Sequence, residues 1–374
     1  MVDNIPFESK IQACIFASKH NKEVTWDFNN NAFNAYNWTI EPGMNLDALY
    51  DKRSRELREK YDYIILSYSA GADSHNILMS FIRQNLHIDE IIVNVMDKVT
   101  EKFRVIDTKQ TASWNAAAEH DLQTVPRLKE IATIIPNTKI TVLDMSNFIF
   151  DMFLEYGDAS WVETRTEGLN PYNVTRYNYA YFKEVRNKFD KNKSIGLVFG
   201  SDKPRTFINE DNFFIMFNDR AANLISVADN SQEYTNCAIE LFYWSPDALD
   251  LLCKQAHVIK RWVEFNPDKK DSWINFSGEK FRLVHERLLR SILYSTWNDS
   301  WWQADKSVKE WDSEFDYFFT RKHKDSKSFQ IWKEGINYVS KEASKYVRYV
   351  DGVPDGLKVF ANYYKIGKVN FHAG

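Results

Sequence analysis

The chain has 374 residues, of which 44% are hydrophobic and 27% charged, and its net charge is −4. This composition is that of a globular protein with a sizeable core, and the small negative charge argues against a protein that coats nucleic acid with its whole surface. The three cysteines are far apart and form no Cys-x-x-Cys pair, which excludes a zinc ribbon or an iron–sulfur motif. With no signal pattern and no apolar run near 18 residues, we expect a cytoplasmic protein without membrane contact.

The first half of the chain alternates helical and strand patterns. Residues 1–45 predict only short irregular elements packed on the core. The apolar spacing predicts helices at 45–60, 74–84, 114–131, 147–156 and 177–189, with Pro126 as a kink or break. Nearly continuous apolar runs predict buried strands at 63–67, 87–95, 139–144 and 194–200.

From about Ser245 onward the sequence is rich in Trp and Lys and shows no convincing strand alternation. It predicts helices at 246–265, 279–297, 308–319 and 328–346. The whole pattern predicts an α/β protein in which helices cover both faces of a parallel sheet, followed by a helical C-terminal region. We expect three parts: an N-terminal segment (1–60), an α/β domain (61–244) and the helical region (245–374).

The most informative segment is the one that joins the first strand to its helix. Ser69 and Ser74 carry hydroxyl groups that can bond phosphate, and Gly71 permits a backbone geometry that other residues resist. The helix that follows directly offers its N-terminal N–H groups to an anion. Asp73 suits a phosphate site only if Mg²⁺ accompanies the nucleotide. The alternative is a simple strand-to-helix turn in which Asp73 or Ser74 caps the helix.

The run Ser69-Ala70-Gly71-Ala72-Asp73-Ser74 resembles the Ser-Gly-Gly-x-Asp-Ser signature of the PP-loop ATP pyrophosphatases. That family includes asparagine synthetase-like amidotransferases, GMP and NAD synthetases, tRNA thiolases and PAPS reductases, and its fold is Rossmann-like (HUP-like). The resemblance covers about residues 60–205 and implies ATP and Mg²⁺ as cofactors. It departs from the family at Ala70, where the first glycine of the pair is usual.

The resemblance assigns further residues to the nucleotide. Ser67 ends the strand before the loop, and Asn94, Val95 and Met96 end the second strand, where adenine rests on the backbone in the family. Arg176 could reach a phosphate from the same edge of the sheet; a solvated helix start is the alternative.

A second constellation, Gly200-Ser201-Asp202-Lys203-Pro204-Arg205, follows the fourth strand. Ligands in open parallel sheets bind beyond the carboxyl ends of the strands, so this turn and the first loop belong to one predicted site. We expect Lys203 and Arg205 to neutralise the leaving pyrophosphate and Asp202 to share Mg²⁺ with Asp73. An ordinary surface turn explains Gly200, Asp202 and Pro204 equally well.

Other patterns in the sequence give weaker indications of function. Val2 stands where an N-terminal glutaminase domain would need a catalytic cysteine, and the paired cysteines of many thiolases are absent. Cys253 and His257 share a helix face, as a Cys–His nucleophile pair would, although such spacing is common by chance. The aromatic run from Glu240 to Pro246 could contact a substrate or belong to the core.

The resulting hypothesis is an ATP pyrophosphatase of the ligase type, most similar to the asparagine synthetase-like branch. It would adenylate a carboxylate or carbonyl oxygen of a small molecule, release pyrophosphate and expose the carbon to a nitrogen or sulfur nucleophile. Two alternatives stay open: an enzyme that modifies a nucleobase in tRNA or DNA, and an ATP-binding sensor with a degenerate loop.

Overall fold

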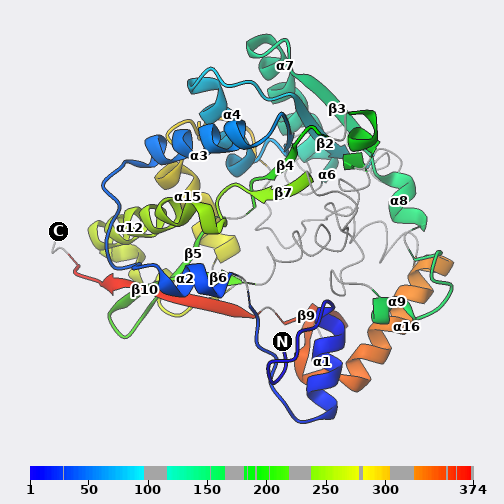
Figure 1. Cartoon of the computed structure of the whole chain (residues 1–374). Coiled ribbons are helices and arrows are strands. Elements are labelled where there is room, and N and C mark those ends of the chain that lie inside the picture. Colours follow the sequence, from blue (N-terminus) through cyan, green and yellow to red (C-terminus); the bar gives the residue numbers. More distant parts are fainter. Residues whose placement is uncertain are drawn as a thin grey trace.

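The computed structural model describes residues 1–27, 29–96, 116–151, 153–164, 181–182, 184–189, 192–201, 203–218, 237–277, 281–303, 324–350, 353–358 and 360–371. The protein is an α/β protein built on a five-stranded parallel sheet with helices around it (Figure 1). The strands are β1 (Tyr63–Ser67), β2 (Glu90–Val95), β3 (Lys139–Asp144), β4 (Ile195–Phe199) and β7 (Cys237–Leu241). The predicted fold class, a parallel sheet flanked by helices with helices near the C-terminus, is confirmed.

The order of the strands positions the site. The sheet runs β3-β2-β1-β4-β7, so the chain moves outward from β1 in one direction and then returns to build β4 and β7 on the other side. The order therefore reverses between β1 and β4, which are direct neighbours with Ser67 opposite Phe199. Ligands of open parallel sheets bind beyond the carboxyl ends of the strands at such a switch point.

Two helices flank the first of these loops along the chain. Helix α3 (Leu46–Lys60) begins at Asn45, whose side chain accepts a hydrogen bond from the N–H of Ala48 at 2.8 Å. Helix α4 (Ala72–Arg83) starts directly after the loop and packs on α3. Both helices lie where the sequence predicted them, because their apolar residues face one continuous core.

A buried carboxylate ties α3 to the last strand of the sheet. Glu240 on β7 accepts hydrogen bonds from Arg53 at 3.0 Å and Lys60 at 2.6 Å, and from the hydroxyl of Tyr61. Burial alone would raise the pKa of Glu240, but these partners hold it below its ordinary value of 4.5. The first residue of the predicted aromatic junction is therefore part of the scaffold.

A second, antiparallel sheet lies beside the first and was not predicted. Strands β5 (Arg205–Asn209) and β6 (Asn212–Asn218) form a hairpin whose two turn residues, Glu210 and Asp211, have φ of 49° and 55°. Such turns favour residues with left-handed backbone, and their twist matches that of the strands. Strand β10 (Ala361–Lys368) pairs along the other side of β6.

The part of the chain after Ser245 contains strands as well as helices, and the prediction that it shows none is wrong. Besides β10, strands β8 (Val347–Val350) and β9 (Val353–Leu357) form a small sheet of their own. The helices there are α12 (Leu249–Phe265), α13 (Lys270–Trp273), α15 (Glu286–Leu293) and α16 (Lys327–Glu342). The predicted helix at 308–319 lies outside the described residues.

A second hydrophobic cluster joins distant parts of the chain. Helix α1 (Lys10–Lys19) packs there with α9 (Trp161–Thr164) and α16 (Figure 1). A Cβ on Gly335 would lie 2.4 Å from the ring of Trp161, so only glycine allows this approach. The N-terminal segment is thus not irregular: α1 and α2 (Asn30–Ala35) are helices, and the expectation is corrected.

The remaining elements shift the predicted boundaries. The helix expected at 114–131 consists of α6 (Ala116–Glu119), a π-helical turn (His120–Thr124) and α7 (Val125–Ile134). Pro126 follows the π-helical turn directly and lies within backbone that stays helical across the boundary, so the proline interrupts the hydrogen-bond ladder without ending the helix. The helix at 147–156 is shorter, α8 (Ser146–Asp151). Among the helices that the structure describes, none is long and apolar enough to cross a membrane.

Candidate nucleotide-binding site

The loop after β1 is closed by its own serines. The N–H of Ser69 donates to Ser74 Oγ at 3.3 Å, the N–H of Gly71 donates to Ser69 Oγ at 3.4 Å, and Ser74 Oγ donates to the carbonyl of Gly71 at 3.2 Å. No side chain caps the N-terminus of α4. The first N–H groups of this twelve-residue helix therefore have no side-chain cap, and they carry the positive end of the helix dipole.

Ala70 occupies a backbone conformation that glycine adopts more easily. Its φ is 57°, and its side chain is completely buried. Left-handed backbone costs an L-residue about 1–2 kcal/mol, so a small residue is needed here. Alanine is small enough for this buried position but carries the strain that glycine would avoid.

The loop after β4 lies directly against the first turn of α4. A Cβ on Gly200 would come within 3.0 Å of the backbone nitrogen of Ser74 and 3.1 Å of the carbonyl carbon of Asp73. The absence of a side chain at Gly200 is what lets the two loops touch. Lys203, three residues further on, is almost fully buried, and its Nζ lies 2.7 Å from Asp73 Oδ2.

Asp73 is the centre of the site, and two tyrosines complete its surroundings. The hydroxyl of Tyr294 donates to Asp73 Oδ1 at 2.5 Å, and that of Tyr243 donates to the backbone carbonyl of Asp73 at 2.9 Å. Burial, reinforced by the charge of Asp73, raises the pKa of both phenols well above the usual value. Both therefore act as hydrogen-bond donors at every physiological pH.

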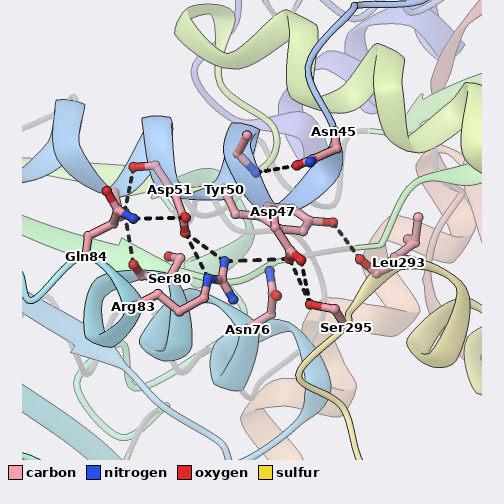
Figure 2. A network of polar contacts seen from close by, with 12 residues as sticks. Asn45, Asp47, Tyr50, Asp51, Asn76, Ser80, Arg83, Gln84, Leu293 and Ser295 are labelled. Carbon is pink, nitrogen blue, oxygen red and sulfur yellow. Dashed lines mark hydrogen bonds and ion pairs between the residues drawn. The ribbon is translucent and has the colours of Figure 1, made fainter.

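Contacts between α3 and the two neighbours of Tyr294, Leu293 and Ser295, fix the segment that carries this tyrosine (Figure 2). The hydroxyl of Tyr50 donates to the carbonyl of Leu293 at 3.1 Å, and Ser295 Oγ donates to Asp47 at 2.8 Å, so both neighbours of Tyr294 are held. Tyr294 was not predicted as a site residue. It lies at the end of α15 and comes to Asp73 only through long-range packing, for which the sequence carries no local signal.

Helix α7 adds a buried cation to the same loop. The guanidinium of Arg127 donates from Nη1 to the carbonyl of Ala70 and lies over the rings of Trp297, at 4.8 Å, and Trp301, at 4.5 Å. Next to it, burial and the charge of Arg127 lower the pKa of His75 to about 4. His75 is thus neutral near pH 7. Arg127 also escaped prediction, since nothing in its local sequence marks it.

The structure separates the two predicted cations. Lys203 lies beside Asp73, and its expected role at the leaving pyrophosphate stays a prediction. Arg205 lies on β5, and its guanidinium packs over the rings of Phe281, at 4.9 Å, and Phe276, at 6.0 Å.

The other predicted nucleotide contacts lie at the same edge of the sheet or outside the described residues. Ser67 ends β1 and is half-buried. Asn94 and Val95 end β2, and the side-chain oxygen of Asn94 is buried with no hydrogen-bond partner in the described part of the chain. Met96 is buried in the second hydrophobic cluster. Asp202 and Arg176 lie outside the described residues.

The Cys–His pair on α12 is structural. Cys253 Sγ donates to the carbonyls of Trp38 and Ile40 at 3.5 and 3.4 Å, and His257 Nε2 lies 3.1 Å from the same Trp38 carbonyl. Burial raises the pKa of the Cys253 thiol to about 12. Since the thiolate is the nucleophile, Cys253 is unreactive at neutral pH.

No group of three or more His, Cys, Asp and Glu side chains that could hold a metal ion occurs among the residues described. Asp73 offers a single carboxylate, and both of its oxygens have partners, Tyr294 at Oδ1 and Lys203 at Oδ2; Asp73 as a ligand of Mg²⁺ stays a prediction. The sequence matches no known protein-family model and no curated protein.

Proposed function

We propose that the protein is an ATP pyrophosphatase that binds the triphosphate of ATP across the loops after β1 and β4. The observation that carries this proposal is the contact between the two loops at the switch point of the sheet. There a buried lysine of one loop lies 2.7 Å from the carboxylate at the start of α4. Cations, hydroxyls and helix N–H groups converge at the place where an open α/β sheet binds its ligand.

Each residue of the proposed site has its own role in binding and catalysis. Backbone N–H groups of the first turn of α4, with the hydroxyls of Ser69 and Ser74, hold phosphate oxygens. Lys203 passes from Asp73 to the phosphates and neutralises charge on the leaving group, while Tyr294 keeps Asp73 oriented. Asp73 would hold Mg²⁺, which supplies further charge neutralisation on the phosphates.

The reaction is a displacement at the α-phosphorus. An acceptor oxygen forms the new bond to the α-phosphorus, and the bond from that phosphorus to the bridging oxygen breaks, so that pyrophosphate leaves and the acceptor carries AMP. A carboxylate or carbonyl oxygen of a small molecule is the acceptor that the resemblance favours, with a nitrogen or sulfur nucleophile in the next step. A cytoplasmic location fits an ATP-consuming protein whose cysteines are free thiols.

The test is product analysis with ATP labelled at the α or γ position, in the presence of Mg²⁺ and pools of amino acids, small acids or tRNA. Wild type should form AMP and pyrophosphate with one pool, and Asp73→Asn and Lys203→Met should lose at least 100-fold in rate. The matched control is Lys254→Met. Lys254 lies on α12 and forms an ion pair of similar length, with its Nζ 2.6 Å from Glu41 Oε1. ADP and phosphate as products would refute the proposal, and so would equal loss in the control.

A further inference from the structure

The charge of Arg127 is buried but incompletely paired. The residue is 4% exposed, and Nη1 donates to the carbonyl of Ala70, whereas Nη2 is buried with no hydrogen-bond partner in the described part of the chain. None of the ion pairs among the described residues includes Arg127. Burial lowers the pKa of this guanidinium, and the charge of Arg290 adds to the effect. A buried cation of this kind costs stability unless an anion joins it.

Other unsatisfied donors lie at the same place. The indole Nε1 of Trp297 and the hydroxyl of Thr296 are also buried without a hydrogen-bond partner in this part of the structure. The guanidinium of Arg290 lies 5.8 Å from the ring of Trp297, over which Arg127 lies at 4.8 Å. Two positive charges therefore lie near one indole ring whose own N–H is unsatisfied, and Arg127 links this ring to the loop after β1.

The hydrogen-bond donors of this cluster determine which kind of ligand it can bind. Buried donors in native proteins are almost always satisfied, and leaving one unpaired costs about 1–3 kcal/mol. Guanidinium groups and an indole N–H offer donors only, so the missing partner is an acceptor, and two cations around one ring favour an acceptor with negative charge. A cation or an uncharged apolar group would leave every one of these costs in place.

We propose that Arg127, Arg290 and the indole N–H of Trp297 form an oxyanion subsite that takes a phosphoryl group of the nucleotide. The proposal deepens the proposed function and rests on it for the identity of the ligand. We assign a phosphoryl group as the anion because Nη1 of Arg127 donates to the carbonyl of Ala70. Ala70 belongs to the loop that would bind the triphosphate, so the subsite adjoins the phosphates. Residues 294–301 after α15 thereby complete the site: Tyr294 orients Asp73, and Trp297 and Trp301 hold Arg127.

The experiment measures binding of inorganic pyrophosphate to the full chain by calorimetry, without turnover. Arg127→Lys keeps a charge but loses the planar fork, and Arg290→Gln removes a charge from a half-buried position. Each should weaken pyrophosphate binding about 10- to 100-fold. Trp297→Phe keeps an aromatic ring and removes only the donor, so a loss of about fivefold is expected. Arg287→Gln, on the exposed side of α15, is the charge-matched control and should change the affinity less than twofold.

The outcomes separate the subsite from the reaction. Unchanged pyrophosphate affinity in Arg290→Gln and Trp297→Phe would overturn the subsite even if AMP and pyrophosphate are formed from ATP. Arginine-dependent pyrophosphate binding in a protein that does not turn over ATP would support the subsite and count against the proposed reaction. Titration with succinate provides the second arm: binding of succinate, but not of pyrophosphate, that depends on Arg290 would overturn the assignment to phosphate.

Discussion

Replacing Ala70 by glycine tests the geometry of the loop directly. Three effects compete in Ala70→Gly. Relief of left-handed strain, at φ 57°, should gain about 1–2 kcal/mol. Loss of a fully buried methyl group costs about 0.8 kcal/mol, and the extra freedom of glycine in the unfolded chain costs about 0.4–1 kcal/mol. The gain and the losses nearly cancel, so the free energy of unfolding should stay within about 1 kcal/mol of wild type.

Ala72→Gly provides a matched control two residues away. Ala72 is also buried, at 4% exposure, but it is the first residue of α4 and has no left-handed strain to relieve. Loss of its methyl group costs about 0.8 kcal/mol, and glycine in a helix costs about 0.8–1 kcal/mol. This variant should therefore lose close to 2 kcal/mol.

Urea unfolding followed by tryptophan fluorescence measures both variants in the same transition. We expect the midpoint of Ala70→Gly to stay near that of wild type and the midpoint of Ala72→Gly to fall clearly, with equal slopes. If Ala70→Gly loses as much stability as Ala72→Gly, Ala70 gains nothing from relief of strain, and the account of the loop given above is wrong.

Three further variants test the surroundings of the site and the scaffold. Tyr294→Phe should lower the free energy of unfolding by about 1–2 kcal/mol. This is less than a hydrogen bond to a charged group can contribute, because Asp73 is 20% exposed and water can replace the phenol. An unchanged urea midpoint would contradict this expectation. Glu240→Gln should cost about 3 kcal/mol at pH 7, since it leaves the buried Arg53 with only Glu56, at 4.0 Å, as an anionic partner. The native pKa of Glu240 lies below 4.5, so the stability that the ionised carboxylate contributes is complete above that pH and is lost as the pH falls through the native pKa. The difference in free energy of unfolding between Glu240→Gln and wild type should therefore narrow in acid. A difference that does not depend on pH would refute the role given to the Glu240 carboxylate. Cys253→Ala should leave ATP turnover intact, and wild-type Cys253 should resist iodoacetamide at pH 8; loss of turnover would restore Cys253 as a catalytic candidate.

The sheet and the first loop could be predicted because their signals are local. A parallel strand buried on both faces must be apolar along its whole length, and β1 and β4 were recognised for that reason. That the loop after β4 lies beside the first loop followed from one rule about strand ends in open sheets, whereas the ion pair between Lys203 and Asp73 was not predicted. Both inferences need only neighbouring residues and the order of the strands.

The missed features depend on contacts between distant residues. Tyr294 reaches Asp73 across more than 200 positions of sequence, and Arg127 meets Trp297 and Trp301 only after the C-terminal helices have packed. The second sheet left a weak signal that was overlooked: β10 alternates exposed and half-buried residues, and Glu210-Asp211 fits a two-residue turn. Such a turn pattern is much less distinctive than an apolar strand.

The pairing of β10 with β6 has a consequence for biosynthesis. The hairpin that continues from the loop of Lys203 is translated early, but its outer neighbour emerges from the ribosome only after helices α12 to α16. Until then β6 presents an open edge to other nascent chains, which is a hazard for aggregation. We therefore expect a chain truncated before Ala361 to require chaperones. The yield of the truncated chain, compared with that of the full chain, would report how strongly the pairing of β10 with β6 protects the hairpin of β5 and β6 from aggregation.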